Sequence, residues 1–271
     1  MLRKIKILKT YLSIGKISLK SILANKSSVV ILLLQALVPS LVMFYLWSLI
    51  LDQGQTIGGF SKNQIVIYYI GVNFINSFVW YAVDWELNDD IHSGELSNII
   101  HRPIAIEKYY FAKMLGDRLA NLLLLLPILV IGFLYILLNN LLHVSPMVLV
   151  EFAVSIVLSA ILWFLFSYIV GSVAYWFDNL FFVLLVKEVV VNLLAGFYFP
   201  LEILPSFLVK ITKCLPFQYF SSFPIDTLVK GFSLANWGKN TLVELIWAAV
   251  FYLMVQIVNK KGLQRYSDVM G

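Results

Sequence analysis

The sequence is poor in charged residues and in cysteine. Only 13% of its 271 residues are Asp, Glu, Lys or Arg, about half the share of a typical soluble domain, while 61% are hydrophobic. One core cannot bury so large an apolar excess, so part of it must face lipid. The composition excludes a soluble enzyme, a nucleic-acid-binding protein and a disordered chain. The single cysteine, Cys214, excludes an internal disulfide and a metal site built from cysteines.

The motifs of common nucleotide and catalytic sites are also absent from the sequence. It has no G-x-x-x-x-G-K-[ST] loop, so the chain does not bind ATP in the P-loop manner, and no H-E-x-x-H zinc motif. His92, His101 and His143 lack the spacing of a zinc site, and no serine lies in a G-x-S-x-G context. We therefore expect no catalytic residue, metal or cofactor on this chain.

The first 27 residues are strongly basic, with seven Lys and Arg and no acid. At 100° per residue, the apolar side chains of this segment fall on one stripe. The stripe comprises Ile5, Leu8, Leu12, Leu19, Ile22 and Leu23. Residues 1–27 are therefore predicted to form a basic amphipathic helix that lies in the headgroup plane and attracts anionic membrane lipid. A merely basic leader is the alternative.

Six apolar runs approach the roughly 20 residues that a helix needs to cross a bilayer. They are residues 28–51, 64–83, 119–142, 147–176, 180–200 and 240–258. If the amino terminus lies inside, 14 of the 20 Lys and Arg fall on inner segments, which places both termini in the cytoplasm. We expect an all-α integral membrane protein, with a six-span domain over 28–258 and a cytoplasmic tail over 259–271.

Two segments between the predicted spans have unusual compositions. Residues 84–118 are too polar for a bilayer, yet rich in apolar residues. Asp90 or Ser93 is expected to cap a short helix over 95–101, which could be a docking element or a loop that rests on its own protein. Residues 197–239 are apolar but cut by four prolines, which predicts short re-entrant or interfacial helices on the outer side.

Polar residues inside the predicted spans are few and therefore informative. Asn73, Asn76, Ser77 and Trp80 follow a helical i, i+3, i+4, i+7 pattern, which indicates either a translocation path or hydrogen bonds between helices.

The fifth predicted span carries two charges. Lys187 and Glu188 are adjacent and point about 100° apart, so we do not expect them to pair with each other. Glu188 and Asn192 share a face, which indicates a subunit interface or a cavity. Gln35 in the first span is a similar, weaker case.

The order of these features resembles the permease subunits of ABC-2-type transporters over essentially the whole chain. Residues 84–118 contain a G-x-L-x-x-x-x-x-R-P stretch, and the tail contains G-L-x-R-Y. The residues that match are Gly94, Leu96, Arg102 and Pro103, then Gly262, Leu263, Arg265 and Tyr266. The proline-broken outer region is similar to the paired short helices that precede the last span in this family.

The resemblance implies an exporter permease of a bacterial plasma membrane, driven by a separate soluble ABC ATPase that binds ATP and Mg²⁺. A second permease subunit, non-identical or a copy, would complete the pathway. The implied ATPase-docking residues are Glu86, Asp90, Gly94, Glu95, Leu96, Arg102 and Pro103. The implied pathway or dimer-interface residues are Gln35, Asn73, Asn76, Ser77, Lys187, Glu188 and Asn192. Sparse charge in the spans favours an amphipathic or hydrophobic substrate.

Other interpretations remain open on the sequence. A polysaccharide or teichoic-acid exporter permease would present aromatic residues along its channel, whereas the tryptophans here lie mostly near span ends. A membrane-embedded enzyme would need catalytic residues at matched depth, and a channel or other transporter would show inverted repeats or a charged pathway.

Overall fold

The chain is helical along most of its length. The computed structural model describes residues 2–51, 56, 58–102, 104–138 and 145–270; 85% of the chain is helical, and the described part contains no strand. The elements are α1 (Leu2–Ala24), α2 (Lys26–Ile50), α3 (Lys62–Phe78), α4 (Val83–Ser93), α5 (Leu96–Ile100), α6 (Ile106–Leu138), α7 (Pro146–Gly171), η1 (Ser172–Tyr175), α8 (Phe181–Ala195), η2 (Leu201–Ile203), α9 (Ser206–Cys214), η3 (Pro216–Phe220), α10 (Ser222–Val229) and α11 (Leu234–Met270).

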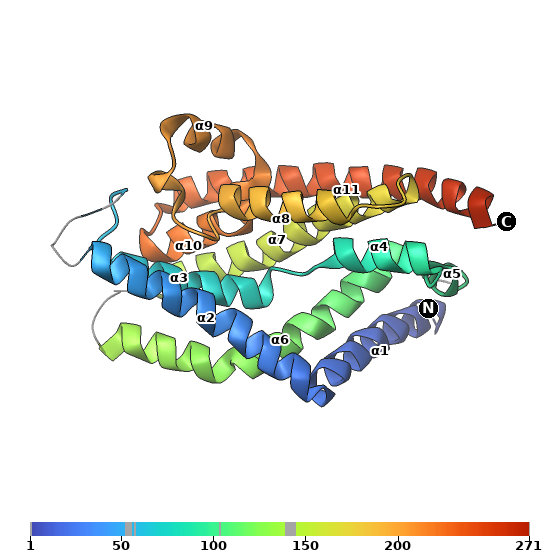
Figure 1. Ribbon diagram of the computed structural model, residues 1–271, viewed down its shortest axis with the longest axis horizontal. Coiled ribbons are helices and arrows are strands. Elements are labelled where there is room, and N and C mark those ends of the chain that lie inside the picture. The colour runs from blue at the N-terminus through green and yellow to red at the C-terminus, as the bar shows by residue number, and fades with distance from the viewer. Residues whose placement is uncertain (1, 52–55, 57, 103, 139–144, 271) are drawn as a thin grey trace.

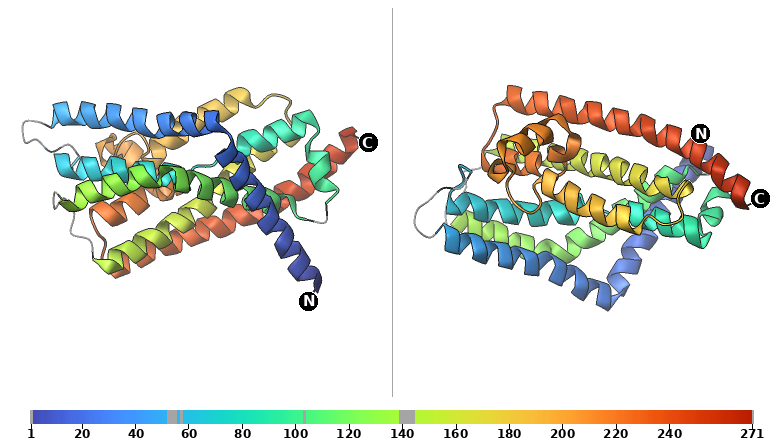
Figure 2. Two further views of the ribbon diagram at one scale, coloured as in Figure 1. Left: turned by 90° about the horizontal axis from the view of Figure 1, so that it is seen from below. Right: turned by 45° about the horizontal axis from the view of Figure 1, so that its top comes forward.

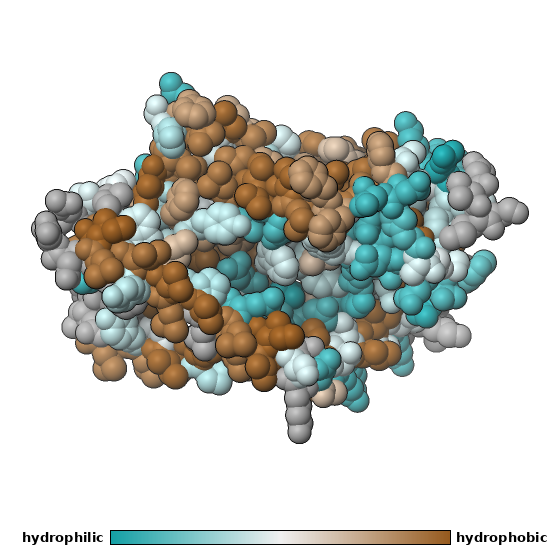
Figure 3. All heavy atoms as spheres, in the orientation of Figure 1, coloured by the Kyte–Doolittle hydropathy of each residue, from teal (hydrophilic) through white to brown (hydrophobic). Residues whose placement is uncertain are grey.

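Helix α7 forms the centre of the bundle, with α3, α4, α10 and α11 packed around it. Its Leu162, Trp163 and Tyr168 side chains are fully buried. The Trp163 ring meets Phe197 and Phe220 edge to face, so α7 also holds the segment that follows α8 and the short helix η3. Both termini and α5 lie at the same end of the molecule, where hydrophilic residues gather, while apolar side chains cover much of the rest of the visible face (Figures 1 and 3).

Four helical stretches are long and apolar enough to cross a membrane. They are Lys62–Ser93, Ile106–Tyr135, Pro146–Tyr175 and Leu234–Ser267. A bent pair, Lys9–Ala24 with Val29–Gln35, would make a fifth. The expected fifth span ends early because α8 has only 15 residues, about 22 Å of helix, which is less than a hydrocarbon core of about 30 Å. The protein is thus an all-α, multi-pass membrane protein.

Capping chemistry explains several of the helix ends. Ser61 and Gln64 form a reciprocal capping box at the start of α3, and Ser145 caps α7 just before Pro146. At the other end of an element, α8 stops at Gly196, whose φ of 84° is in the left-handed region.

The segment 197–239 contains short helical pieces, as its prolines predict. Pro205 precedes α9 and Pro216 is the first residue of η3, so each proline stands where its missing N–H costs no helical hydrogen bond. Residues 84–118 are more regular than expected. They contain α4, α5 and the first turns of α6, which runs on without a break into the expected third span.

The short helix expected over 95–101 is confirmed as α5 (Leu96–Ile100). The expected caps are wrong, because Asp90 lies inside α4, Ser93 is its last residue, and Glu95 is the N-cap of α5 without a side-chain hydrogen bond. The sequence pattern did not reveal that α4 extends this far.

Candidate functional site

The helical path breaks between α3 and α4, at residues 79–82. Arg118 on α6 is buried beside this break and donates hydrogen bonds to the backbone carbonyls of Ser77 and Trp80. Its guanidinium also lies 5.4 Å from the centre of the Tyr81 ring. Carbonyls at a helix end have no partner in the helix, so Arg118 satisfies groups that the break leaves open.

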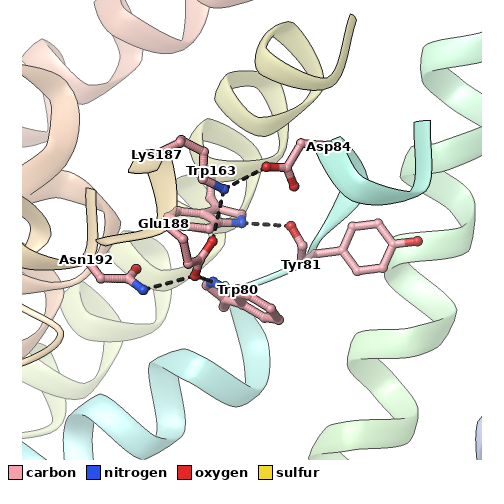
Figure 4. A network of polar contacts seen from close by, with 7 residues as sticks. All are labelled: Trp80, Tyr81, Asp84, Trp163, Lys187, Glu188 and Asn192. Carbon is pink, nitrogen blue, oxygen red and sulfur yellow. Dashed lines mark hydrogen bonds and ion pairs between the residues drawn. The ribbon is translucent and has the colours of Figure 1, made fainter. Parts of the chain in front are cut away.

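A buried network joins this break to α8 (Figure 4). The Lys187 Nζ atom lies 2.8 Å from Asp84 Oδ2 on α4 and 3.2 Å from Glu188 Oε2. The side chains of Lys187 and Asp84 are 6% and 0% exposed. The ammonium also lies 5.0 Å from the centre of the Trp163 ring. Paired in this way, the charges avoid the cost of an isolated buried ion.

Glu188 closes the network on the other side. Its Oε1 atom accepts hydrogen bonds from Trp80 Nε1 at 2.8 Å and from Asn192 Nδ2 at 2.9 Å. Trp163 in turn donates to the backbone oxygen of Tyr81 at 2.9 Å. Residues from the break, from α7 and from α8 therefore hold one another in place.

The structure corrects one expectation about these charges and confirms another. The prediction that Lys187 and Glu188 do not pair is wrong, because the long lysine side chain bends to reach both Glu188 and Asp84. The shared face of Glu188 and Asn192 is confirmed by their hydrogen bond.

Four of the predicted pathway residues meet at one pocket. The pocket, of about 190 Å³, lies between α2, α3, α8 and the segment after α8. Its lining is Gln35, Pro39, Met43, Tyr69, Val72, Asn73, Asn76, Asn192, Phe197 and Tyr198. Amides from three helices thus face one small space.

The predicted polar stripe of the second span is only partly a stripe. Trp80 lies outside α3, which ends at Phe78, so the helical spacing does not extend to it. Ser77 is buried and donates to the backbone oxygen of Asn73 at 2.7 Å, and Asn73 donates to the backbone oxygen of Tyr69 at 3.1 Å. These two bonds lie within the helix rather than between helices.

The segment around α5 divides its residues between the interior and the surface. Gly94 ends α4 with a φ of 81°, which turns the chain so that Leu96 is buried. Glu95 and Arg102 are exposed, while Pro103 lies outside the described residues.

Two carboxylates of α4, Glu86 and Asp90, bind side chains of neighbouring segments. Glu86 pairs with Lys113 on α6 and accepts from the Tyr81 hydroxyl at 2.5 Å. Asp90 accepts from the Tyr110 hydroxyl, also at 2.5 Å. Both acids therefore fix α4 to its neighbours.

A family model described as ABC-2 family transporter protein matches residues 37–268. The match takes in α3 to α10, α11 up to residue 268, the buried network and every lining residue of the pocket except Gln35. The chain belongs to the ABC-2 transporter family. Comparison with curated proteins and with solved structures gave no match. This protein is accordingly a multi-pass transport permease and not a catalytic subunit.

The terminal G-L-x-R-Y motif of this ABC-2 permease has a packing explanation. A Cβ atom at Gly262 on α11 would overlap the Tyr175 ring of η1. Tyr266, one turn later, packs edge to face on the same ring, with centroids 6.4 Å apart. The glycine lets α11 approach η1, and the tyrosine covers the contact.

Sequence reasoning missed two buried acids of the permease, Glu151 on α7 and Glu244 on α11. Ser159 lies 3.2 Å from Glu244 Oε1 and donates to the backbone oxygen of Tyr219 at 2.6 Å. Both acids lie inside predicted spans, so an acidic residue within an apolar run is the signal that identifies them. Among the described residues, no group of three or more His, Cys, Asp and Glu is placed to hold a metal ion.

The segment 197–239 carries its own charged cluster. Lys230 pairs with Glu202 and lies 2.9 Å from Asp226 Oδ1, at the wall of a pocket of about 250 Å³. Burial raises the pKa of Asp226 to about 6, although the Lys230 ammonium opposes this shift.

Proposed function

We propose that this chain is the permease subunit of an ABC exporter and forms part of the path for an amphipathic or hydrophobic substrate. The observation that supports it best is the amide-lined pocket beside the broken α3–α4 path, because the Asp84–Lys187–Glu188 network ties that break to α8, one wall of the pocket. A movement of α4 would be transmitted to the pocket through these contacts.

The energy would come from a soluble ABC ATPase that binds ATP and Mg²⁺ and docks at the α5 end. The exposed Glu95 and Arg102 and the half-turn at Gly94 form the contact surface, while the buried Leu96 anchors it. Closure of the ATPase on ATP would push α5 and α4 together, and hydrolysis would release them. Glu86 and Asp90 would act indirectly, by making α4 rigid.

The pocket also supports the substrate class. Its polar groups are amides and tyrosine hydroxyls, and none of its lining residues carries a full charge. Such a lining favours neutral or weakly polar groups on an otherwise apolar molecule. At about 190 Å³ the pocket is smaller than the about 300–1,000 Å³ of usual ligand sites, so a second permease subunit, identical or not, would complete it.

We place six helical segments in a bacterial plasma membrane, with both termini in the cytoplasm. Helices α2 and α8 would provide the first and fifth segments, and α8 would reach only part of the bilayer. The positive charge of α1 and the position of both termini at the α5 end support this orientation.

Size-exclusion chromatography of the purified permease–ATPase complex tests the docking surface. The double reversal Glu95→Arg with Arg102→Glu should release the ATPase and leave membrane insertion intact. Lys210→Glu with Lys213→Glu, on exposed positions of α9, is a control for charge reversal elsewhere on the surface and should retain it. If the first variant keeps a stoichiometric ATPase with normal ATP hydrolysis, α5 is not the docking site.

A second experiment tests the pathway in inside-out vesicles, with the uncharged dye Nile red as the amphipathic probe. Asn76→Trp would fill the pocket and should abolish ATP-driven uptake, whereas Val157→Trp on the exposed face of α7 should not. Equal uptake by both variants would contradict the assignment of the pocket to the pathway.

A further inference from the structure

A third cavity lies between α1 and the first turns of α6. Figure 2 shows the crossing of these two helices. At the crossing the two backbones touch, because a Cβ atom at Gly15 would lie only 2.9 Å from the Ala112 oxygen. The Ser18 hydroxyl bonds to Asp117 on the same side of α6. Beside this contact the helices diverge and enclose a groove of about 520 Å³.

The walls of this α1–α6 groove are almost wholly apolar. They are formed by Leu12 and Leu19 of α1 and by Phe111, Leu115 and Leu119 of α6. Three of these five side chains, Leu12, Leu115 and Leu119, are exposed, although each lies against a hydrophobic neighbour. Such a surface is stable only where it contacts lipid or another apolar partner.

The rim of the groove is cationic. Lys16 on α1 and Lys108 on α6 both line it, and both are exposed. No carboxylate is among its described lining residues, and neither lysine has an ion pair within the described part of the chain. Their aliphatic stems add to the apolar wall while the ammonium groups remain at the edge.

We propose that the α1–α6 groove binds one anionic phospholipid, with an acyl chain against the leucines and the headgroup phosphate between Lys16 and Lys108. The apolar wall matches the chain, and two ammonium groups without a carboxylate match a net negative headgroup. A zwitterionic lipid would bind more weakly, because its own positive group would lie beside the two lysine ammonium groups. The volume lies within the usual range of ligand sites.

A bound lipid would add a further connection between α1 and α6, whose crossing already includes the close approach of Gly15 to Ala112 and Gly116 and the Ser18–Asp117 bond. It would thus fix the angle between α1 and α6. This inference does not depend on the proposed transport function, since lipid binding requires neither the ATPase nor a substrate.

Native mass spectrometry of the full-length permease in mild detergent tests the proposal. Phosphatidylglycerol and phosphatidylcholine are added at equal concentration, and the expected result is preferential retention of one phosphatidylglycerol. Lys16→Gln with Lys108→Gln should weaken that binding about 30-fold, because each lysine near an anionic group contributes a factor of about five. Leu115→Trp, which fills the groove and keeps both lysines, should also displace the lipid.

The matched control removes the same charge from exposed sites that do not line the groove, Lys9→Gln with Lys20→Gln, and should leave retention unchanged. An equal loss in the control would mean diffuse attraction to the basic helix, and the proposal would be wrong. It would also be overturned if the Lys16 and Lys108 variant bound phosphatidylglycerol like the unmodified protein, or if the two lipids were retained equally.

Discussion

The Lys187 ammonium of α8 lies 2.8 Å from the Asp84 carboxylate of α4, although 103 positions separate the two residues. Both side chains are buried, so neither charge has water to replace its partner. The pair joins a helix at the candidate docking end to a helix at the pathway pocket. Removal of one member leaves the other as an uncompensated charge, which is the more expensive state.

We predict that Lys187→Met or Asp84→Asn alone destabilises the permease by about 3–5 kcal/mol. Thermal unfolding in mild detergent, followed by tryptophan fluorescence, measures this change. The combined variant should lose less than the sum of the two. Lys113→Met, which breaks the more exposed pair with Glu86, is the control and should cost about 1 kcal/mol or less. Equal losses at the two pairs would contradict the buried role of Lys187.

The second prediction concerns two glycines of α11. Gly262→Ala should destabilise the protein by about 1–3 kcal/mol, because its new methyl group meets the Tyr175 ring. Gly238→Ala, in the same helix with nothing within 4 Å, should instead stabilise it by about 0.5–1 kcal/mol. In a Tyr175→Ala background the Gly262 effect should shrink. If Gly262→Ala stays costly there, the cause is not the ring.

The sequence predicts the helical class, the centres of most spans and the short outer helices, because periodicity, apolar runs and prolines act locally. Asp84 illustrates what local patterns omit. It was assigned to a polar segment between spans, and its partner on α8 is defined only by tertiary packing. The position of α8 on α4 also lets Lys187 reach two acids, which no helical wheel of α8 alone reveals.

Arg118 shows a related limit of sequence reasoning. In the sequence its charge indicates only membrane topology, yet the side chain is buried against the carbonyls of a break that hydropathy does not reveal. By contrast, Asn73, Asn76 and Asn192 were found by their polarity alone, because polar groups are rare in spans, and three-dimensional packing brings them to one pocket.

The third prediction is a pH dependence of the stability of segment 197–239. The pKa of Asp226 is raised from 3.8 to about 6 by burial, so the folded state binds its proton more tightly than the unfolded state. The contribution of Asp226 to stability is therefore highest below about pH 4 and decreases as the pH rises from about 4 to about 6, by up to about 3 kcal/mol in all. Above about pH 6 this group causes little further change. Lys230 keeps its charge throughout this range, since its pKa is raised above the ordinary value.

Hydrogen exchange of α10 between pH 4 and 7, corrected for the intrinsic rate, measures this local stability. Asp226→Asn should flatten the dependence, whereas Glu202→Gln, on the exposed side of the same cluster, should retain most of it, because burial raises the pKa of Asp226 more than the Glu202 charge does. An unchanged profile in Asp226→Asn would assign the effect to another group.

The last prediction concerns Glu188, which accepts from Trp80 and Asn192 through Oε1 and contacts Lys187 through Oε2. Glu188→Gln keeps an acceptor for the two donors but places an amide beside the ammonium. Glu188→Leu removes both the charge and the acceptor oxygens, and it leaves the Trp80 and Asn192 donors without an acceptor at the edge of the pocket. Because an unsatisfied buried donor costs about 1–3 kcal/mol, Leu should destabilise the permease more than Gln does.

The fluorescence of Trp80, in a variant whose other tryptophans are replaced by phenylalanine, should shift with Leu and change little with Gln. Equal behaviour of the two variants would mean that the carboxylate charge, not the hydrogen bonds, positions this wall of the pocket.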